Sequence, residues 1–110
     1  MITTFKEIKA IIEPIPEDKF CVYEYRNDEG RCCFLGHIHL TKSDKPYGDH
    51  NGYGARALTA KFLNEVHGYG GNGADVNNGN KVNGYNQPVI KDRLMAMIED
   101  GIKWEEGKSN

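Results

Sequence analysis

The run Arg31–Leu40 constrains the fold of this chain most, because it reads as a buried strand and carries the closest pair of histidines. In a strand, successive side chains point to opposite faces. Cys33, Leu35, His37 and His39 would then share one face, and the other face would be apolar. Gly36, in the middle of the run, is typical of a bulge or of a close approach by another backbone. The pattern therefore predicts a strand that brings both imidazoles to the same side.

The preceding residues predict a partner for this strand. Phe20–Tyr25 is rich in strand formers, and Asn27–Gly30 supplies turn residues between the two runs. Together they predict an antiparallel β-hairpin. The polar segment Thr41–Gly54, broken by Pro46 and three glycines, predicts a loop.

Apolar residues at helical spacing predict three helices around this hairpin. The first opens on a capping box formed by Thr4 and Glu7, and the third opens at Pro88. The predicted helices span Phe5–Glu13, Ala55–His67 with Gly68 as the stop, and Pro88 to a stop at Gly101. We expect one α+β domain over residues 1–104: an N-terminal helix, an antiparallel β-hairpin, then two helices joined by a long Gly/Asn-rich loop. Residues 105–110 are predicted to be a flexible tail.

The Gly/Asn-rich loop, Gly68–Asn86, has six glycines and six asparagines among its 19 residues. Both residue types tolerate left-handed backbone conformations, and loops of this length are usually functional or disordered. Backbone amides with Asn77 and Asn78 could hold an anion, and Tyr69 and Tyr85 could stack on a base or sugar. The alternative is that the segment only turns the chain between two helices.

Composition limits the partners. Leu, Ile, Val and Phe make up 23 of 110 residues, and the net charge is only −2, which favours a folded domain. No block of Lys or Arg is present, so a nucleic-acid duplex is disfavoured as a partner. No apolar run reaches the roughly 20 residues of a membrane span, and Met1–Lys6 does not resemble a signal peptide. Three cysteines, two of them adjacent, make a poor disulfide framework. These features predict a cytoplasmic protein without a membrane partner.

Short motifs suggest a family. With Cys33-Phe-Leu-Gly36, then Asn77-Asn78 and a closing helix from Pro88, the chain resembles a family of small uncharacterised bacterial and phage proteins. That family carries a Cys-x-Leu-Gly segment and an Asn-Asp pair before a C-terminal helix. This chain has Asn78 where Asp is usual, and histidines after Gly36 where small apolar residues are usual. The resemblance implies a helix at that segment, which would separate the two rings, and it implies no activity.

Enzymatic alternatives are incomplete. His37 and His39, with Asp49, His50 or His67 as a third ligand, could form the metal site of a metal-dependent hydrolase. The two histidines are more simply explained as partly exposed residues at a strand end. A nucleophilic Cys32 or Cys33 is less favoured than a buried apolar thiol.

The leading hypothesis is a small non-catalytic binding protein that needs no cofactor. It would recognise a small ligand, such as a nucleotide signal, or a protein partner, as an accessory or anti-defence factor of a phage or mobile element. The expected ligand-binding residues are His37, His39, Tyr69, Asn77, Asn78 and Tyr85. We also expect a homodimer, because an isolated hairpin needs additional cover.

Overall fold

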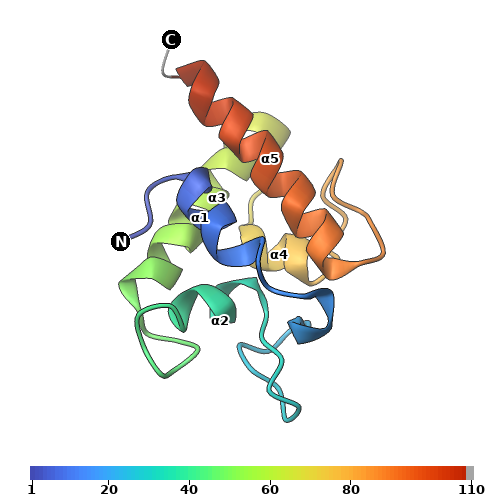
Figure 1. Cartoon of the computed structure of the whole chain (residues 1–110). Coiled ribbons are helices and arrows are strands. Elements are labelled where there is room, and N and C mark those ends of the chain that lie inside the picture. Colours follow the sequence, from blue (N-terminus) through green and yellow to red (C-terminus); the bar gives the residue numbers. More distant parts are fainter. Residues whose placement is uncertain (109–110) are drawn as a thin grey trace.

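The protein is mostly helical over residues 1–108, the part of the chain that the computed structural model describes (Figure 1). The two longest helices are α3 and α5, and a short 3-10 helix, η1, follows α1. The elements are α1 (Phe5–Ile12), η1 (Glu17–Lys19), α2 (Phe34–His39), α3 (His50–His67), α4 (Gly73–Asn77) and α5 (Ile90–Lys108). None of the helices within residues 1–108 is both long and apolar enough to cross a membrane.

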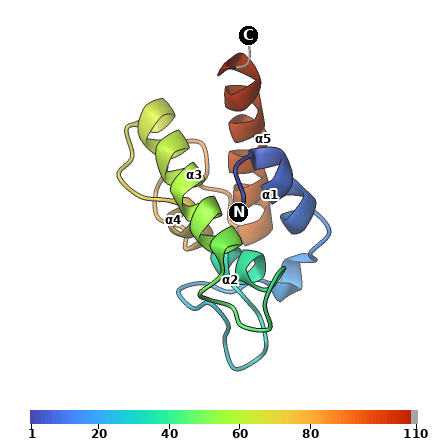
Figure 2. The same ribbon diagram turned by 90° about the vertical axis from the view of Figure 1, so that its left-hand side faces the viewer.

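The short helices pack against α3 and α5. Helix α1 lies along α5, α2 lies against one end of α3, and α4 contacts both long helices (Figures 1 and 2). The core between them includes Phe5, Phe34, Phe62 and Met97, all essentially inaccessible to solvent. Phe5 and Phe62 meet edge to face, and the half-buried Trp104 packs on both rings.

The predicted α+β fold is wrong, because no β-hairpin forms within residues 1–108. Backbone pairing in this region is limited to two isolated bridges, one between Cys32 and Phe20 and one between Cys32 and Arg26, the residue after the first predicted strand. Tyr23, in the middle of the first predicted strand, has a φ of +65°, which is incompatible with a strand. The chain therefore crosses this region as an irregular segment.

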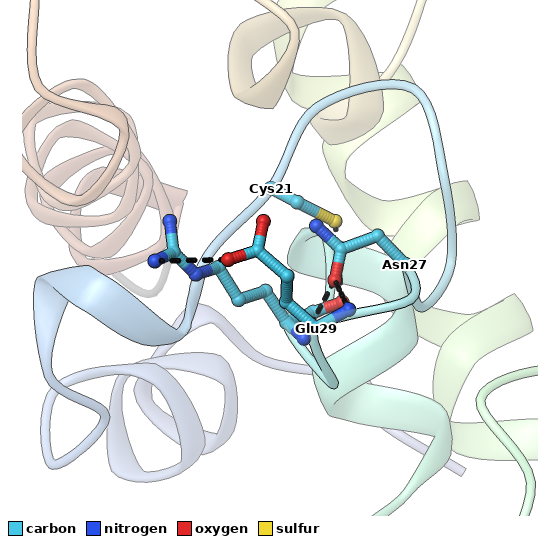
Figure 3. Close-up of polar contacts among 4 residues, drawn as sticks. Cys21, Asn27 and Glu29 are labelled. Atoms are coloured by element: carbon cyan, nitrogen blue, oxygen red, sulfur yellow. Dashed lines mark hydrogen bonds and ion pairs between the residues drawn. The ribbon is translucent and has the colours of Figure 1, made fainter.

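The turn between the predicted strands is nevertheless present. The Oδ1 atom of Asn27 accepts hydrogen bonds from the backbone N–H groups of Glu29 and Arg31, at 3.0 and 2.9 Å (Figure 3). Gly30 follows with a φ of +77°. The thiol of Cys21 donates to the carbonyl oxygen of Arg31, which ties the two sides of the segment together.

The second predicted strand contains helix α2. Phe34, Leu35 and Ile38 are buried, and their spacing fits a helix buried on several sides as well as it fits a strand. Cys33 caps the helix with its sulfur, and Gly36 lies so close to the carbonyl oxygen of Tyr25 that a Cβ there would overlap it. The expected close backbone approach at Gly36 is confirmed, but on a helix.

Helix α3 starts five residues before the predicted Ala55. Asp49 caps it by accepting a hydrogen bond from the N–H of Asn51 at 2.8 Å. Gly52 and Gly54, which suggested a loop, lie inside the helix. Both positions require glycine, because a Cβ at Gly52 would overlap the His39 ring, and one at Gly54 would overlap the backbone of Ile2. Gly68 ends α3 in the left-handed conformation, as predicted.

Helix α5 also exceeds its predicted length. Gly101 does not end it, because the glycine faces the ring of Phe5 in the contact between α1 and α5. The predicted tail is helical from Glu105 to Lys108, and Glu105 accepts a hydrogen bond from the N–H of Phe5 at 2.8 Å. Residues 109–110 lie outside the described residues. The Gly/Asn-rich loop is likewise interrupted by α4, which Asn72 caps.

Candidate functional site

The two histidines of α2 do not form a common site. Two residues along a helix correspond to a rotation of about 200° around its axis, so the two rings lie on nearly opposite sides of α2. The Nε2 atom of His37 donates to the carbonyl oxygen of Lys19 at 2.9 Å, and its ring meets Phe20 edge to face. Burial lowers the pKa of His37 below its ordinary value, which favours the neutral ring.

His39 is buried, and its ring supports two tyrosine side chains. Its Nδ1 atom accepts a hydrogen bond from the N–H of Asp49 at 3.0 Å, and burial lowers the pKa of the ring. The ring lies between Tyr25 and Tyr53, in edge-to-face contacts with centroids 5.6 and 5.5 Å away. His39 therefore orients two exposed tyrosines that come from distant parts of the chain.

Two other predicted ligand-binding residues are engaged inside the protein. Asn77 is fully buried, with its Oδ1 atom accepting from Phe34 N–H at 2.9 Å and its Nδ2 atom donating to the carbonyl oxygen of Cys21 at 2.9 Å. Tyr85 is also buried, and its hydroxyl donates to Asp100 at 2.9 Å while His67 lies 3.0 Å away. Both side chains hold helices in place.

The surface of α3 that faces the Gly/Asn-rich loop carries the most suggestive hollow. This first hollow has a volume of about 540 Å³, and Tyr53, Arg56, Asn64, Tyr69 and Gly71 are among the residues that line it. The volume lies in the range of roughly 300–1,000 Å³ that is usual for small-molecule sites. A tyrosine stands on each of the two chain segments that form the hollow.

A second, smaller hollow of about 260 Å³ adjoins the first. It is formed by the irregular segment before α2 and by α4, and its lining includes Tyr23, Glu24, Tyr25 and Asn78. Arg56 and Asn72 line both hollows, so the two adjoin at these residues. We call the pair the Arg56 groove.

Arg56 gives this groove its charge. Its side chain is exposed and forms no hydrogen bond or ion pair with any residue in the described part of the chain, 1–108. Among the described residues that line the two hollows, it is the one cation, and Glu24 is the one carboxylate. A planar guanidinium with free donors is suited to bind a phosphate or carboxylate.

The walls of the groove are fixed by specific hydrogen bonds. On one side, the buried hydroxyl of Thr59 in α3 accepts from the N–H of Gly73 at 2.8 Å, which holds the start of α4 against α3. On the other side, Asn78 accepts from the N–H of Tyr23 at 2.8 Å. Tyr23 is the one non-glycine residue with a positive φ within residues 1–108, and its side chain is 73% exposed. Such strained positions are enriched at functional sites.

Of the residues expected from the sequence, Tyr69 and Asn78 line the groove, and His39 lies behind it. Sequence reasoning missed Arg56 and three of the tyrosines. One signal was available: Tyr53, Arg56, Ala57, Ala60 and Asn64 recur at helical spacing, and they form one polar face of α3 with small residues at its centre.

The sequence raised two enzymatic alternatives, a metal site and a nucleophilic cysteine. Within residues 1–108 no three His, Cys, Asp or Glu side chains converge in a way that could hold a metal ion. Burial raises the pKa of the Cys32 and Cys33 thiols, and a protonated thiol is a poor nucleophile.

Comparison of the chain with family models, with curated proteins and with solved structures finds no match.

Proposed function

We propose that the protein binds a small anionic ligand with a flat ring, of the nucleoside monophosphate class, in the Arg56 groove. The observation that carries the proposal is the Arg56 side chain, which pairs with none of residues 1–108 and borders a hollow that Tyr53 and Tyr69 also line. The guanidinium would bind the phosphate, and a tyrosine ring would stack on the base. Asn64 and the glycine backbone of residues 70–71 would supply further hydrogen bonds.

Binding without conversion is the simpler activity for this groove. The lining of the first hollow holds no histidine, cysteine or carboxylate that could act as a base or nucleophile. The second hollow adds Glu24 and Cys33, and burial raises the pKa of the Cys33 thiol, which keeps it protonated. The protein would therefore sequester or sense its ligand. The proposal places it in the cytoplasm, where its free thiols, Cys21, Cys32 and Cys33, stay reduced.

Calorimetric titration with adenosine and guanosine monophosphate tests the proposal. The variant Arg56→Gln removes the charge from the groove, and Lys61→Gln removes an exposed charge from α3 outside it. A lost charge-assisted hydrogen bond costs about 1.5–3 kcal/mol, so we expect Arg56→Gln to weaken binding by roughly 10- to 150-fold. Lys61→Gln should bind like the wild type. Wild-type protein that binds neither nucleotide would overturn the proposal.

A second candidate function is self-association through the exposed tyrosines. Tyr23 is 73% exposed and Tyr47 is 53% exposed, and tyrosine is enriched at protein interfaces. A homodimer that uses Tyr23 would dissociate in Tyr23→Ser, and one that uses Tyr47 would dissociate in Tyr47→Ser. Sedimentation equilibrium measures this directly, and a wild-type protein that stays monomeric at all concentrations tested would exclude it.

A further inference from the structure

The Arg56 groove has two compartments, and its one cation stands where they meet. The first hollow offers Tyr53 and Tyr69, and the second offers Tyr23 and Tyr25, while Arg56 borders both. A nucleoside monophosphate needs one ring site beside one anion site. It would leave the tyrosines of the other compartment without a ligand.

We infer that the preferred ligand is a dinucleotide, with two bases joined through a phosphodiester. This inference rests on the proposed function and specifies the ligand of the same site. The linking phosphate would bind Arg56, and each base would stack in one compartment. The arrangement fits one phosphate between two flat rings better than a triphosphate, because the described residues that line the groove supply a single positive charge.

The volumes of the two hollows agree with this division. The first hollow, at about 540 Å³, is large enough to bind a small ligand by itself. The second, at about 260 Å³, lies below the usual range of roughly 300–1,000 Å³ and is useful mainly as an extension of the first. The second base would also meet Glu24, an acceptor for a ring amino group.

The two compartments are also held in fixed positions relative to each other. The His39 ring touches Tyr25 of the second hollow and Tyr53 of the first, so the two tyrosines share one buried support. Asn78 fixes the backbone of Tyr23 at the outer wall of the second hollow. A preorganised groove loses little entropy when a two-ring ligand binds.

Titration with adenosine monophosphate, a linear di-adenylate and a hexa-adenylate strand tests the inference. One added stacked base should tighten binding of the dinucleotide over the mononucleotide by roughly 5- to 150-fold. The hexanucleotide should bind no more tightly than the dinucleotide, after correction for its larger number of binding registers. Tyr23→Leu should weaken the dinucleotide by a similar factor and leave the mononucleotide unchanged, whereas Tyr47→Leu, an exposed tyrosine outside both hollows, should change neither.

The outcomes separate the inference from the proposed function. If mononucleotide and dinucleotide bind equally and Tyr23→Leu has no effect, the inference is wrong and the proposed function stands. If affinity keeps rising with strand length, the ligand is a single-stranded nucleic acid and the inference is also wrong. If none of the three ligands binds, both proposals are wrong.

Discussion

The side chain of Asn77 caps helix α2 from 43 residues away, by accepting a hydrogen bond from the N–H of Phe34 at 2.9 Å. Its Nδ2 atom donates to the carbonyl oxygen of Cys21 at 2.9 Å, so one buried amide joins α4, α2 and the segment that carries Tyr23. The neighbouring Asn78 uses its Oδ1 atom to accept from Tyr23 N–H. The side chain of Asn77 must therefore both accept and donate a hydrogen bond, whereas that of Asn78 needs only to accept.

This difference gives a matched pair of variants. Asn77→Asp loses the donor to Cys21 and places a carboxylate against two oxygen atoms, so we expect the free energy of unfolding to fall by about 2–4 kcal/mol. Asn78→Asp retains an acceptor for Tyr23 N–H and for Asn77 Nδ2, and should change stability by less than about 0.5 kcal/mol. Urea denaturation measures both. Equal losses in the two variants would contradict the role given to Asn77.

Gly101 should be essential for the contact between α1 and α5. A Cβ at this position would lie 2.5 Å from the ring of Phe5, so Gly101→Ala should destabilise the fold by about 1–3 kcal/mol. Gly107 lies in the same helix with no atom within 4 Å of a built Cβ. Gly107→Ala should therefore stabilise the protein by up to about 1 kcal/mol through helix propensity. Thermal denaturation of both variants checks the prediction, and a stable Gly101→Ala protein would show that the helices can separate without cost.

Thr59 should couple the stability of the Gly/Asn-rich loop to ligand binding. Thr59→Val leaves the buried N–H of Gly73 without an acceptor, so we expect a loss of about 1–3 kcal/mol and weaker nucleotide binding. Thr59→Ser keeps the hydroxyl and should bind like the wild type. Denaturation and calorimetry on the same samples measure the two effects, and unchanged binding in Thr59→Val would show that this bond does not shape the groove.

Acid should destabilise the fold through His37 and His39. Burial lowers the pKa of both rings in the folded protein, so between the folded and unfolded pKa values the unfolded chain binds more protons. Stability is then fully present above the unfolded value of about 6.5 and is lost as the pH falls toward the lowered folded values. Each ring contributes a slope of up to about 1.4 kcal/mol per pH unit in that window.

The measurement is urea denaturation across this window, with the wild type and His39→Gln compared at each pH. We expect the variant to be less stable at neutral pH and to have a shallower pH dependence, because one titrating ring is gone. A wild-type stability that is flat or rises on acidification between about pH 7 and pH 5 would contradict the assignment of neutral rings to both histidines in the folded protein.

Local signals predicted part of the fold. The capping box of Thr4 and Glu7 starts α1, and Gly68 ends α3 with a φ of +64°, both as expected. Each of these features depends on residues within one helical turn, so the sequence specifies them directly. Tyr69 and Asn78, which the composition of their loop singled out, line the Arg56 groove.

Long-range contacts explain what the sequence did not predict. The apolar run around Phe34 fits a strand and a buried helix equally, and the cap that favours the helix comes from Asn77. Gly52 and Gly101 resemble loop and stop signals, but their partners, His39 and Phe5, lie on other helices. Arg56 lies on the polar face of α3 and resembles an ordinary surface residue in the sequence. Only the fold brings α4 and the segment that carries Tyr23 beside it.

The most direct measurement of the central claim is a map of backbone amide chemical shifts in the labelled protein during titration with adenosine monophosphate. The account predicts saturable shifts at Arg56 and at residues 69–72 around the first hollow, with no response near Ile102 on α5. A spectrum that does not change, or one that changes only near Ile102, would contradict the assignment of the Arg56 groove as the binding site.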